Sequence, residues 1–300
     1  MIDILQATKN QTKTASLLRM SFGQVNRIMY NAVERGLSRR SNLNEIKHIS
    51  IDEKSFKRGH DYITVLSSPE SGAVLNVSHG RKKEDVKRVI NETFTEEQKK
   101  NIETVSTDMW EAYIKTAETE LPDAKLCHDK FHLVKYLNAA IDIVRRKEAK
   151  RQDTLRNSRF IWLKDQANLT EKQRIMFEAI NNVNLETARA WRIKENFRDI
   201  TFSQPKEESY IIFMRWHRDA LNSNINAIVK VAEMYKRHMN GIINAITLNK
   251  SNAMAERLNG KIQEIKLSAK GYRTFDNFKA AILFFHGKLN MLPIGNFVEP

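Results

Sequence analysis

Lys47-His48-Ile49-Ser50-Ile51-Asp52 is a short run in which apolar and polar side chains alternate, as they do in a half-buried β-strand. The alternation returns at residues 62–66. A third β-type run covers residues 72–77, and residues 68–72 between them, Ser-Pro-Glu-Ser-Gly, have the composition of a turn. Further along, the pattern predicts a helix over 82–94, a strand over 103–107, a helix over 110–120, a strand over 124–127 and a long helix from 129 to about 150.

The resulting order, β-β-β-α-β-α-β-α, predicts an α/β fold in which helices cover a mixed sheet. Three strands in hairpins followed by helices and strands in alternation are the order of the ribonuclease-H-like fold. Such an analogy of pattern does not by itself fix a function. We therefore expect a ribonuclease-H-like core whose first part spans residues 46–129.

The rest of the chain is expected to be helical. Residues 130–248 read as a large all-helical insertion with one clear break at 201–209, which contains Pro205. Residues 249–300 follow as the C-terminal helices of the core, at 252–266 and 275–289, separated by Gly271.

Residues 1–45 are predicted to contain a helix-turn-helix. A short helix over 12–20 is followed by a second helix from about Gln24 to Arg35. Ser21 and Gln24, three residues apart, match the sequence pattern of a capping box at the start of the second helix. The polar residues at the start of the second helix, Gln24, Asn26 and Arg27, are the expected DNA contacts. The alternative is a plain helical hairpin that packs on the rest of the protein.

Composition favours a polyanionic partner. The 300 residues carry a net charge of +14, which suits nucleic acid or an anionic membrane surface. No run is long and apolar enough for a membrane span, and the amino terminus lacks a secretory signal, so we expect a cytoplasmic protein with no membrane partner. Cys127 is the only cysteine, which excludes an intrachain disulfide and a cysteine-rich zinc site.

Two aspartates stand where strands are expected to end. Asp52 closes the run quoted above, and Asp108 follows the strand over 103–107. Carboxylates at neighbouring strand ends can converge on a hard cation such as Mg²⁺. For Asp108 alone, a cap on the following helix is the alternative, since an aspartate before a helix is more often a cap than a metal ligand.

Glu256 lies on a helix with two distinct faces. At about 100° per residue, one narrow sector is apolar, and the opposite sector is rich in carboxamides around a single acid. Carboxamides can orient a metal-bound carboxylate or contact DNA without adding charge, whereas the alternative is a solvated polar face. The polar sector contains Asn252, Glu256, Asn259 and Gln263.

Basic residues near these acids are candidates for phosphate contacts. Residues 250–279 hold seven Lys or Arg against three acids, a net charge of 7 − 3 = +4. Any one of these side chains could equally be a solvated surface charge. The candidates are Lys261, Lys266 and Arg273 in this segment, and Lys54, Lys57, Arg58, Lys82 and Lys83 earlier in the chain.

Long ordered blocks of this sequence resemble the bacterial insertion-sequence transposases of the ISL3 group. The four main blocks are residues 51–60 (IDEKSFKRGH), 106–113 (STDMWEAY), 129–135 (DKFHLVK) and 251–262 (SNAMAERLNGKI). Residues 31–37, 162–164 and 271–278 are also similar to that group, so the resemblance covers roughly residues 15–290.

The resemblance implies a DDE active site, with Asp52, Asp108 and Glu256 as catalytic and metal-binding residues. It also implies two Mg²⁺ (or Mn²⁺) ions, 3′-end cleavage and strand transfer on double-stranded DNA (transposon ends and target), and a homo-oligomer in the synaptic complex. A helical insertion accounts for the 256 − 108 = 148 residues between the last two acids.

Asp129 and His132 match an Asp-x-x-His element that follows the second acid in related transposases. The resemblance implies that they orient ligands or contact DNA, as we also expect for Asn252 and Asn259. An ordinary helix-start aspartate and a hydrogen-bonded histidine are the alternative.

The sequence departs from the family at its start. Members commonly carry a zinc-binding region with several cysteines before the helix-turn-helix, and we expect this chain to lack that region. Two other functions therefore stay open. One is a truncated, catalytically idle DNA-binding derivative that competes with or regulates a transposase, and the other is a ribonuclease-H-like nuclease or resolvase without strand transfer.

Overall fold

The computed structural model describes residues 1–164, 168–181, 185–202, 208–249 and 253–293. The chain forms two compact units, one made of Met1–Lys125 with Asn252–Pro300 and the other of Leu126–Ser251. Residues 1–45, which we expected to be a separate DNA-binding region, lie in the first unit together with the sheet. The helical stretch 130–248 falls within the second unit.

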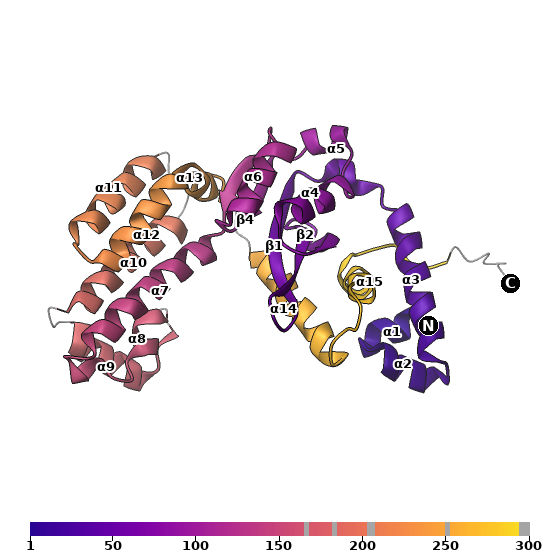
Figure 1. Cartoon of the computed structure of the whole chain (residues 1–300), viewed down its shortest axis with the longest axis horizontal. Helices are drawn as coiled ribbons and strands as arrows, with labels where there is room; N and C mark the ends of the chain where they lie inside the picture. Colours follow the sequence, from indigo (N-terminus) through magenta and orange to yellow (C-terminus); the bar gives the residue numbers. More distant parts are fainter. Residues whose placement is uncertain (165–167, 182–184, 203–207, 250–252, 294–300) are drawn as a thin grey trace. The chain divides into compact units, whose positions relative to one another are not determined.

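The sheet has the strands and the mixed pairing that the sequence predicts. Strands β1 (His48–Lys57), β2 (Asp61–Ser68) and β3 (Ala73–His79) form an antiparallel meander, and β1 pairs with β4 (Thr104–Thr107) in parallel. With β5 (Lys125–His128) the order across the sheet is β3-β2-β1-β4-β5. Together with the helices around it, this arrangement confirms an α/β core of the ribonuclease-H-like type (Figure 1).

Helices cover the sheet within the first unit. Helix α4 (Lys83–Asn91) packs on β3 and on α6 (Glu111–Glu120), α14 (Ala253–Ser268) lies against β1, and α15 (Phe275–His286) packs on β3 (Figure 1). A short helix, α5 (Glu96–Lys100), separates α4 from β4 and was not predicted. Its start is a capping box formed by Thr95 and Gln98.

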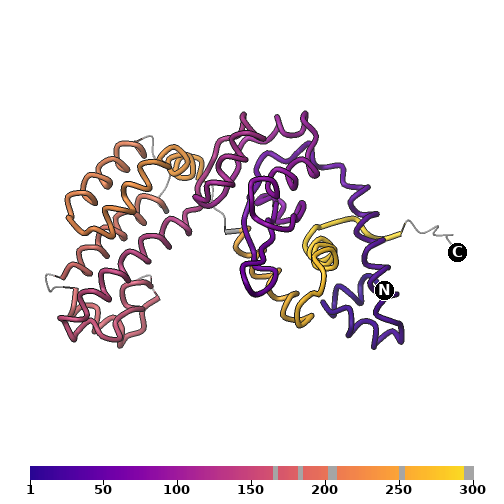
Figure 2. Tube along the Cα trace, in the orientation of Figure 1, coloured from indigo at the N-terminus to yellow at the C-terminus, as the bar shows by residue number. Residues whose placement is uncertain are grey.

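The N-terminal helices share their hydrophobic core with the sheet. Helices α1 (Ile2–Thr8), α2 (Gln11–Leu18) and α3 (Phe22–Ser38) are followed by a 3₁₀ turn (Asn42–Glu45). Val25 and Met29 of α3 belong to the same buried cluster as Leu258 of α14 and Phe278 of α15. Figure 2 accordingly shows the yellow C-terminal segment running beside the indigo N-terminal one. The hairpin thus packs on the core, and its binding to DNA stays a prediction.

The predicted capping box at the start of α3 is present. Ser21 Oγ accepts a hydrogen bond from Gln24 N (3.2 Å), and Gln24 Oε1 accepts one from Ser21 N (2.8 Å). Two backbone donors that a helix start leaves without partners are satisfied in this way.

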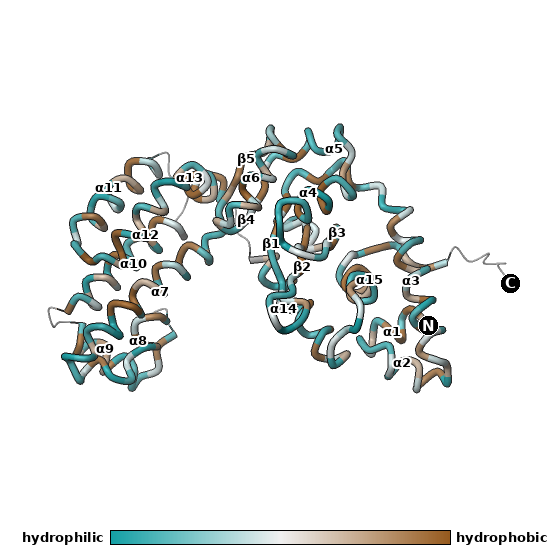
Figure 3. The backbone as a smooth tube through the Cα atoms, viewed as in Figure 1, coloured by the Kyte–Doolittle hydropathy of each residue, from teal (hydrophilic) through white to brown (hydrophobic). Residues whose placement is uncertain are grey.

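Beyond Leu126–His128, which belong to β5, the described residues of the second unit are mainly helical and pack around aromatic side chains. Phe197 lies 4.7 Å from Trp216 and 4.9 Å from Tyr235, measured between ring centroids, and all three are buried. Figure 3 shows brown, hydrophobic residues interspersed with teal, hydrophilic ones along these helices, as amphipathic packing requires. The elements are α7 (Lys130–Glu148), a 3₁₀ turn (Asp153–Leu155), α8 (Arg159–Leu163), α9 (Glu171–Asn181), α10 (Glu186–Phe202), α11 (Ser209–Asn222), α12 (Asn226–Arg237) and α13 (Met239–Thr247).

Across the described ranges, no helix combines the length and the apolar character that crossing a bilayer requires.

Candidate active site

Asp52 of β1 and Asp108, which directly follows β4, come to the same level of these two parallel strands. Ser50 of β1 is the register partner of Ser106 of β4, and continuing this register by two residues brings Asp52 level with Asp108. The expectation that Asp52 ends its strand was wrong, because β1 continues to Lys57 as a hairpin with β2. Asp52 instead lies just past the residues of β1 that pair with β4, since β4 stops at Thr107.

The Asp52 carboxylate is held by one local and one remote donor. The side chain is only 9% exposed. Its Oδ1 accepts a hydrogen bond from Glu53 N (2.8 Å), and its Oδ2 accepts one from Asn259 Nδ2 of α14 (2.5 Å). Asn259, predicted to orient a catalytic acid, therefore contacts that acid directly.

The contact at Asn259 aligns α14 with β1. Glu256 precedes Asn259 by three residues, so the two side chains share one face of α14, and Glu256 is exposed. The start of α14 is held elsewhere: Met254 packs so closely on the turn at Gly72 that a Cβ there would lie 3.0 Å from the Met254 sulfur. Asn252, the other amide expected on this face, lies outside the described residues.

Asp108 is not the N-cap of α6, because Trp110 holds that position without a side-chain cap, and Asp108 lies just before it. Asp108 is half-buried, and its Oδ1 accepts a hydrogen bond from Trp110 N (3.0 Å) where α6 begins. One carboxylate oxygen therefore fixes the backbone at the start of the helix. The bond to Trp110 N also orients the carboxyl group, so it does not exclude metal binding by Asp108.

Tyr113 lies within electrostatic reach of both aspartates, and sequence reasoning missed it. The phenol is buried and its oxygen is 3.3 Å from Thr64 Oγ1. Burial raises the pKa of Tyr113 above its ordinary value, and the negative charges of Glu53, Asp108 and Asp52 raise it further against the opposing bond to Thr64. The buried phenol therefore stays protonated near the two acids.

The donor chemistry of this corner suits a hard divalent cation. Asp52 and Asp108 offer carboxylate oxygens, which Mg²⁺ and Mn²⁺ prefer. Among the described residues, no group of three or more His, Cys, Asp or Glu side chains is already arranged as a metal site. The convergence of Glu256 with the two aspartates therefore stays a prediction.

Asp129 and His132 form a local pair at the start of α7. Asp129 is 1% exposed, and its Oδ1 accepts a hydrogen bond from Phe131 N (3.0 Å) as the cap of the helix. Its Oδ2 lies 2.7 Å from His132 Nδ1. The geometry is that of the helix-start aspartate with its histidine, and a role in ligand orientation or DNA contact stays a prediction.

Several of the predicted phosphate contacts are brought together along the second half of β1. Lys57 Nζ donates to the carbonyl oxygen of Arg273 (2.9 Å), and Lys266 Nζ donates to that of Ser55 (2.9 Å). The pKa of Lys266 is lowered by burial first and then by the positive charge of Lys54. Strand β1 and the end of α14 therefore concentrate positive charge, which favours a polyanion.

The other four predicted contacts lie apart from these interactions, and Lys82 and Lys83 are exposed at the start of α4. Arg58 is exposed beside the β1–β2 turn, and Lys261 is exposed on α14.

On helix α3, the structure separates the three predicted DNA contacts. Asn26 Oδ1 accepts a hydrogen bond from Gln11 Nε2 (2.7 Å) and lines a pocket of about 580 Å³ that is also lined by Arg273 and Asn277. Asn26 thus faces the body of the first unit. Gln24 and Arg27 are exposed, but the Gln24 side chain already closes the capping box.

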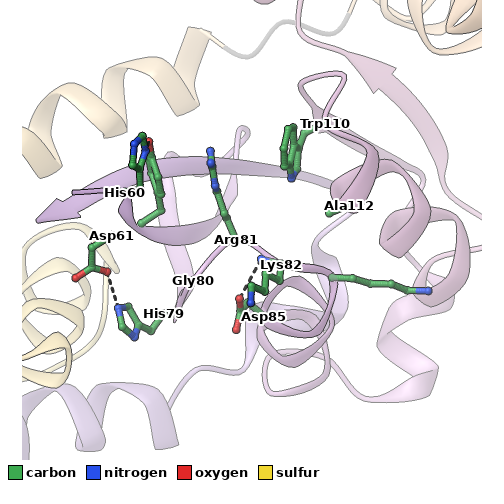
Figure 4. A pocket seen from close by; sticks show the side chains of 11 residues that line it. His60, Asp61, His79, Gly80, Arg81, Lys82, Asp85, Trp110 and Ala112 are labelled. Carbon is green, nitrogen blue, oxygen red and sulfur yellow. Dashed lines mark hydrogen bonds and ion pairs between the residues drawn. The ribbon is translucent and has the colours of Figure 1, made fainter. Parts of the chain in front are cut away.

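A second pocket, of about 520 Å³, was also missed by sequence reasoning. The guanidinium carbon of Arg81 lies 4.0 Å from the centroid of the Tyr62 ring and 5.2 Å from that of Trp110. Arg81 Nη1 also donates to Glu53 Oε2 (2.9 Å). Figure 4 shows Arg81 standing between His60 on one side and Trp110 on the other. The one sequence signal was Trp110 itself, an aromatic residue two positions after Asp108 and 46% exposed.

The comparisons with known proteins agree with this architecture. A curated relative, the transposase for insertion sequence element IS1001 of Bordetella parapertussis, is 27% identical over 242 residues, which are 78% of this chain and 59% of that protein. The transposase for insertion sequence element IS1557 of Mycobacterium tuberculosis is 26% identical over 296 residues, 88% of this chain and 66% of that protein. The chain therefore spans 59% to 66% of the length of these relatives. The family model of ISL3-type DDE transposases, described as transposase, matches residues 49–282, well over half of the sequence, and the chain belongs to that family.

Proposed function

We propose that this chain is a DDE transposase that cleaves the 3′ ends of an insertion sequence and joins them to target DNA. Asp52, Asp108 and Glu256 would be its catalytic acids and the ligands of divalent metal. The observation that carries the proposal is the shared level of Asp52 and Asp108 on parallel strands, combined with the hydrogen bond from Asn259, on the Glu256 helix, to Asp52. Membership of the transposase family supports it independently.

The residues around Asp52 and Asp108 each have a defined role in the proposed site. Asn259 and the backbone of Glu53 hold both oxygens of Asp52, and the start of α6 fixes Asp108. Side chains that are already held in position lose little conformational entropy when they bind an ion or a substrate. When bound, two Mg²⁺ or Mn²⁺ ions would neutralise charge on the phosphate and on the oxygens that attack and leave.

The basic residues along β1 and α14 would hold double-stranded DNA through its phosphates. The ammonium group of Lys57 contacts the loop that follows α14, and that of Lys266 contacts β1. Such contacts position a duplex without reading its sequence, and they weaken as salt is raised. Assembly of two DNA ends would require more than one copy of the chain.

The proposal is tested with the full chain and duplexes made from the DNA that flanks its gene. In Mg²⁺ we expect new 3′ ends followed by joined products. Asp52→Asn, Asp108→Asn and Glu256→Gln each keep the shape of the side chain but remove a metal ligand, so cleavage should fall by about 10³-fold or more while DNA binding persists. Glu264→Gln, an exposed acid further along α14, is the matched control and should cleave normally.

Each alternative outcome has a distinct meaning. Cleavage that persists in all three acid variants would refute the site. Binding without cleavage by the unaltered chain would favour the idle DNA-binding derivative. Cleavage without joining would favour a nuclease.

A further inference from the structure

The pocket around Arg81 adjoins the proposed acids through the chain itself. Glu53, which binds Arg81, follows Asp52 directly, and Trp110 follows Asp108 by two residues. We call this site the Arg81 pocket. Its lining residues are His60, Asp61, Tyr62, His79, Gly80, Arg81, Lys82, Lys83, Asp85, Trp110 and Ala112.

The walls of the Arg81 pocket are flat and cationic. The guanidinium of Arg81 lies over the rings of Tyr62 and Trp110, and its bond to Glu53 helps to hold it there. Trp110 is 46% exposed although an indole gains much by burial, so a large aromatic face stays available at the mouth. At about 520 Å³, the volume lies within the range of roughly 300–1,000 Å³ that is usual for small-molecule sites.

The charges lining the pocket are unequally compensated. Asp61 Oδ1 lies 2.7 Å from His79 Nε2, and Asp85 pairs with Arg88 at 2.8 Å while it also accepts a hydrogen bond from Lys82 N (3.0 Å). Both carboxylates therefore have basic partners. Lys82 and Lys83 add two exposed ammonium groups at the start of α4, so the rim favours an anion.

A flat aromatic face beside a cationic rim is the chemistry that recognises a nucleotide. Bases stack on aromatic side chains or on guanidinium planes, and lysines take the phosphate. Within a duplex the faces of a base are covered by its neighbours, so only an unpaired base could use Trp110. The basic residues along β1 lack this selectivity, because phosphate contacts do not distinguish paired from unpaired strands.

We propose that the Arg81 pocket binds one unpaired nucleotide of a DNA strand, with its base stacked on Trp110 and its phosphate at Lys82 and Lys83. The inference rests on the proposed function for the position of that nucleotide, beside the phosphate to be cleaved. Binding itself requires no catalysis, so it is measured separately.

The test is a binding assay with the full chain in EDTA and low salt, which excludes cleavage. Two labelled probes of one sequence are compared, a blunt 20-base-pair duplex and the same duplex with a three-nucleotide dT fork. The unaltered chain should prefer the fork, and 2-aminopurine in the unpaired segment should change its fluorescence on binding. Trp110→Ala should weaken fork binding by roughly 5-fold or more, the equivalent of one lost base stack, and leave the blunt duplex nearly unaffected.

Controls separate the pocket from general effects. Trp110→Phe keeps a ring and should retain most of the fork preference, which protects the test against a misfolded alanine variant. Tyr210→Ala removes an aromatic side chain of similar exposure from α11 and should change nothing. Lys82→Ala with Lys83→Ala removes two ammonium groups from the rim and should weaken fork binding through lost phosphate contacts.

The outcomes distinguish this inference from the proposed function. An equal fork preference in the unaltered chain and in Trp110→Ala overturns the inference, even if cleavage is normal. A Trp110-dependent preference supports it, even if the chain cleaves nothing. Competition by dTMP as strong as that of the fork at equal concentration would assign the pocket to a free nucleotide and would also overturn it.

Discussion

Asp52 accepts two hydrogen bonds whose donors lie at very different distances along the chain. Glu53 N is the adjacent backbone group, whereas Asn259 Nδ2 comes from 207 residues away. The remote bond directs one carboxylate oxygen and ties α14 to β1. Partners of this kind tune how a ligand presents its oxygens to a metal.

Replacing Asn259 should therefore lower the apparent affinity for Mg²⁺ more than it lowers the stability of the fold. In Asn259→Ala the Asp52 carboxylate loses the donor that α14 supplies, and we expect about 10- to 100-fold weaker apparent Mg²⁺ affinity. Asn259→Asp, which opposes two carboxylates, should lose more. The measurement is the cleavage rate as a function of Mg²⁺ concentration.

Gln263→Ala serves as the control, because Gln263 lies one turn further along the same face of α14 and is half-buried. An Mg²⁺ dependence of Asn259→Ala that overlays that of Gln263→Ala would show that the bond to Asp52 has no role in metal use.

At the scale of elements, the turn between β3 and α4 is arranged around a glycine. Gly80 has φ +92°, a conformation that residues with a Cβ rarely adopt. A Cβ at this position would lie 2.1 Å from Asp85 Oδ2, which holds the backbone N–H of Lys82. The turn thus fixes Arg81 and Lys82 at the mouth of the pocket.

Gly80→Ala should be markedly more destabilising than Gly59→Ala. Both positions have positive φ, +92° and +86°, so both variants incur backbone strain of about 1–2 kcal/mol. Only at Gly80 does the new methyl group collide, whereas nothing lies within 4 Å at Gly59. We expect an additional loss of about 1–3 kcal/mol for Gly80→Ala, measured by urea unfolding. Equal losses would mean that Asp85 moves aside without cost.

At the scale of the whole first unit, the two ends of the sequence meet around α15. His286 of α15 is buried at 9% exposure. Its pKa is lowered to about 4, first by burial and then by the positive charges of Lys261 and Lys9, while a backbone bond to Lys261 and the charge of Glu264 oppose this shift. Residues from α14 and from the end of α1 therefore act on one imidazole.

The buried His286 should make the first unit less stable in mild acid. An unfolded histidine binds a proton below about pH 6.5, whereas folded His286 stays neutral down to about pH 4. Stability from this group is complete above pH 6.5 and is lost as the pH falls from 6.5 towards 4, by about 2 kcal/mol at pH 5. Unfolding in urea at pH 7.5 and pH 5.0 measures this loss.

The matched variants are His286→Leu, which should remove this part of the pH dependence, and His60→Leu at an exposed position, which should retain it. A pH dependence that is the same in His286→Leu and in the unaltered chain would contradict the assignment.

The sequence by itself determined the elements and most of their boundaries. Strand alternation, helical periodicity and the Ser21–Gln24 capping box depend on neighbours within a few residues, so they can be predicted without knowledge of tertiary contacts. The five strands, the mixed sheet and the long helical stretch were predicted in this way. The capping box at Thr95 is an equally local motif but was overlooked, which is why α5 was not predicted.

Tertiary structure alone decided how distant residues combine. Asp52 lies inside a strand because β1 continues as a hairpin after its pairing with β4, and charged residues hid that continuation. Asn26 faces Gln11 instead of the exterior because α3 packs on α15, and Arg81 meets Trp110 only because the turn after β3 lies beside the start of α6. Such contacts join segments tens or hundreds of residues apart, so packing of the complete core sets them and no local pattern encodes them.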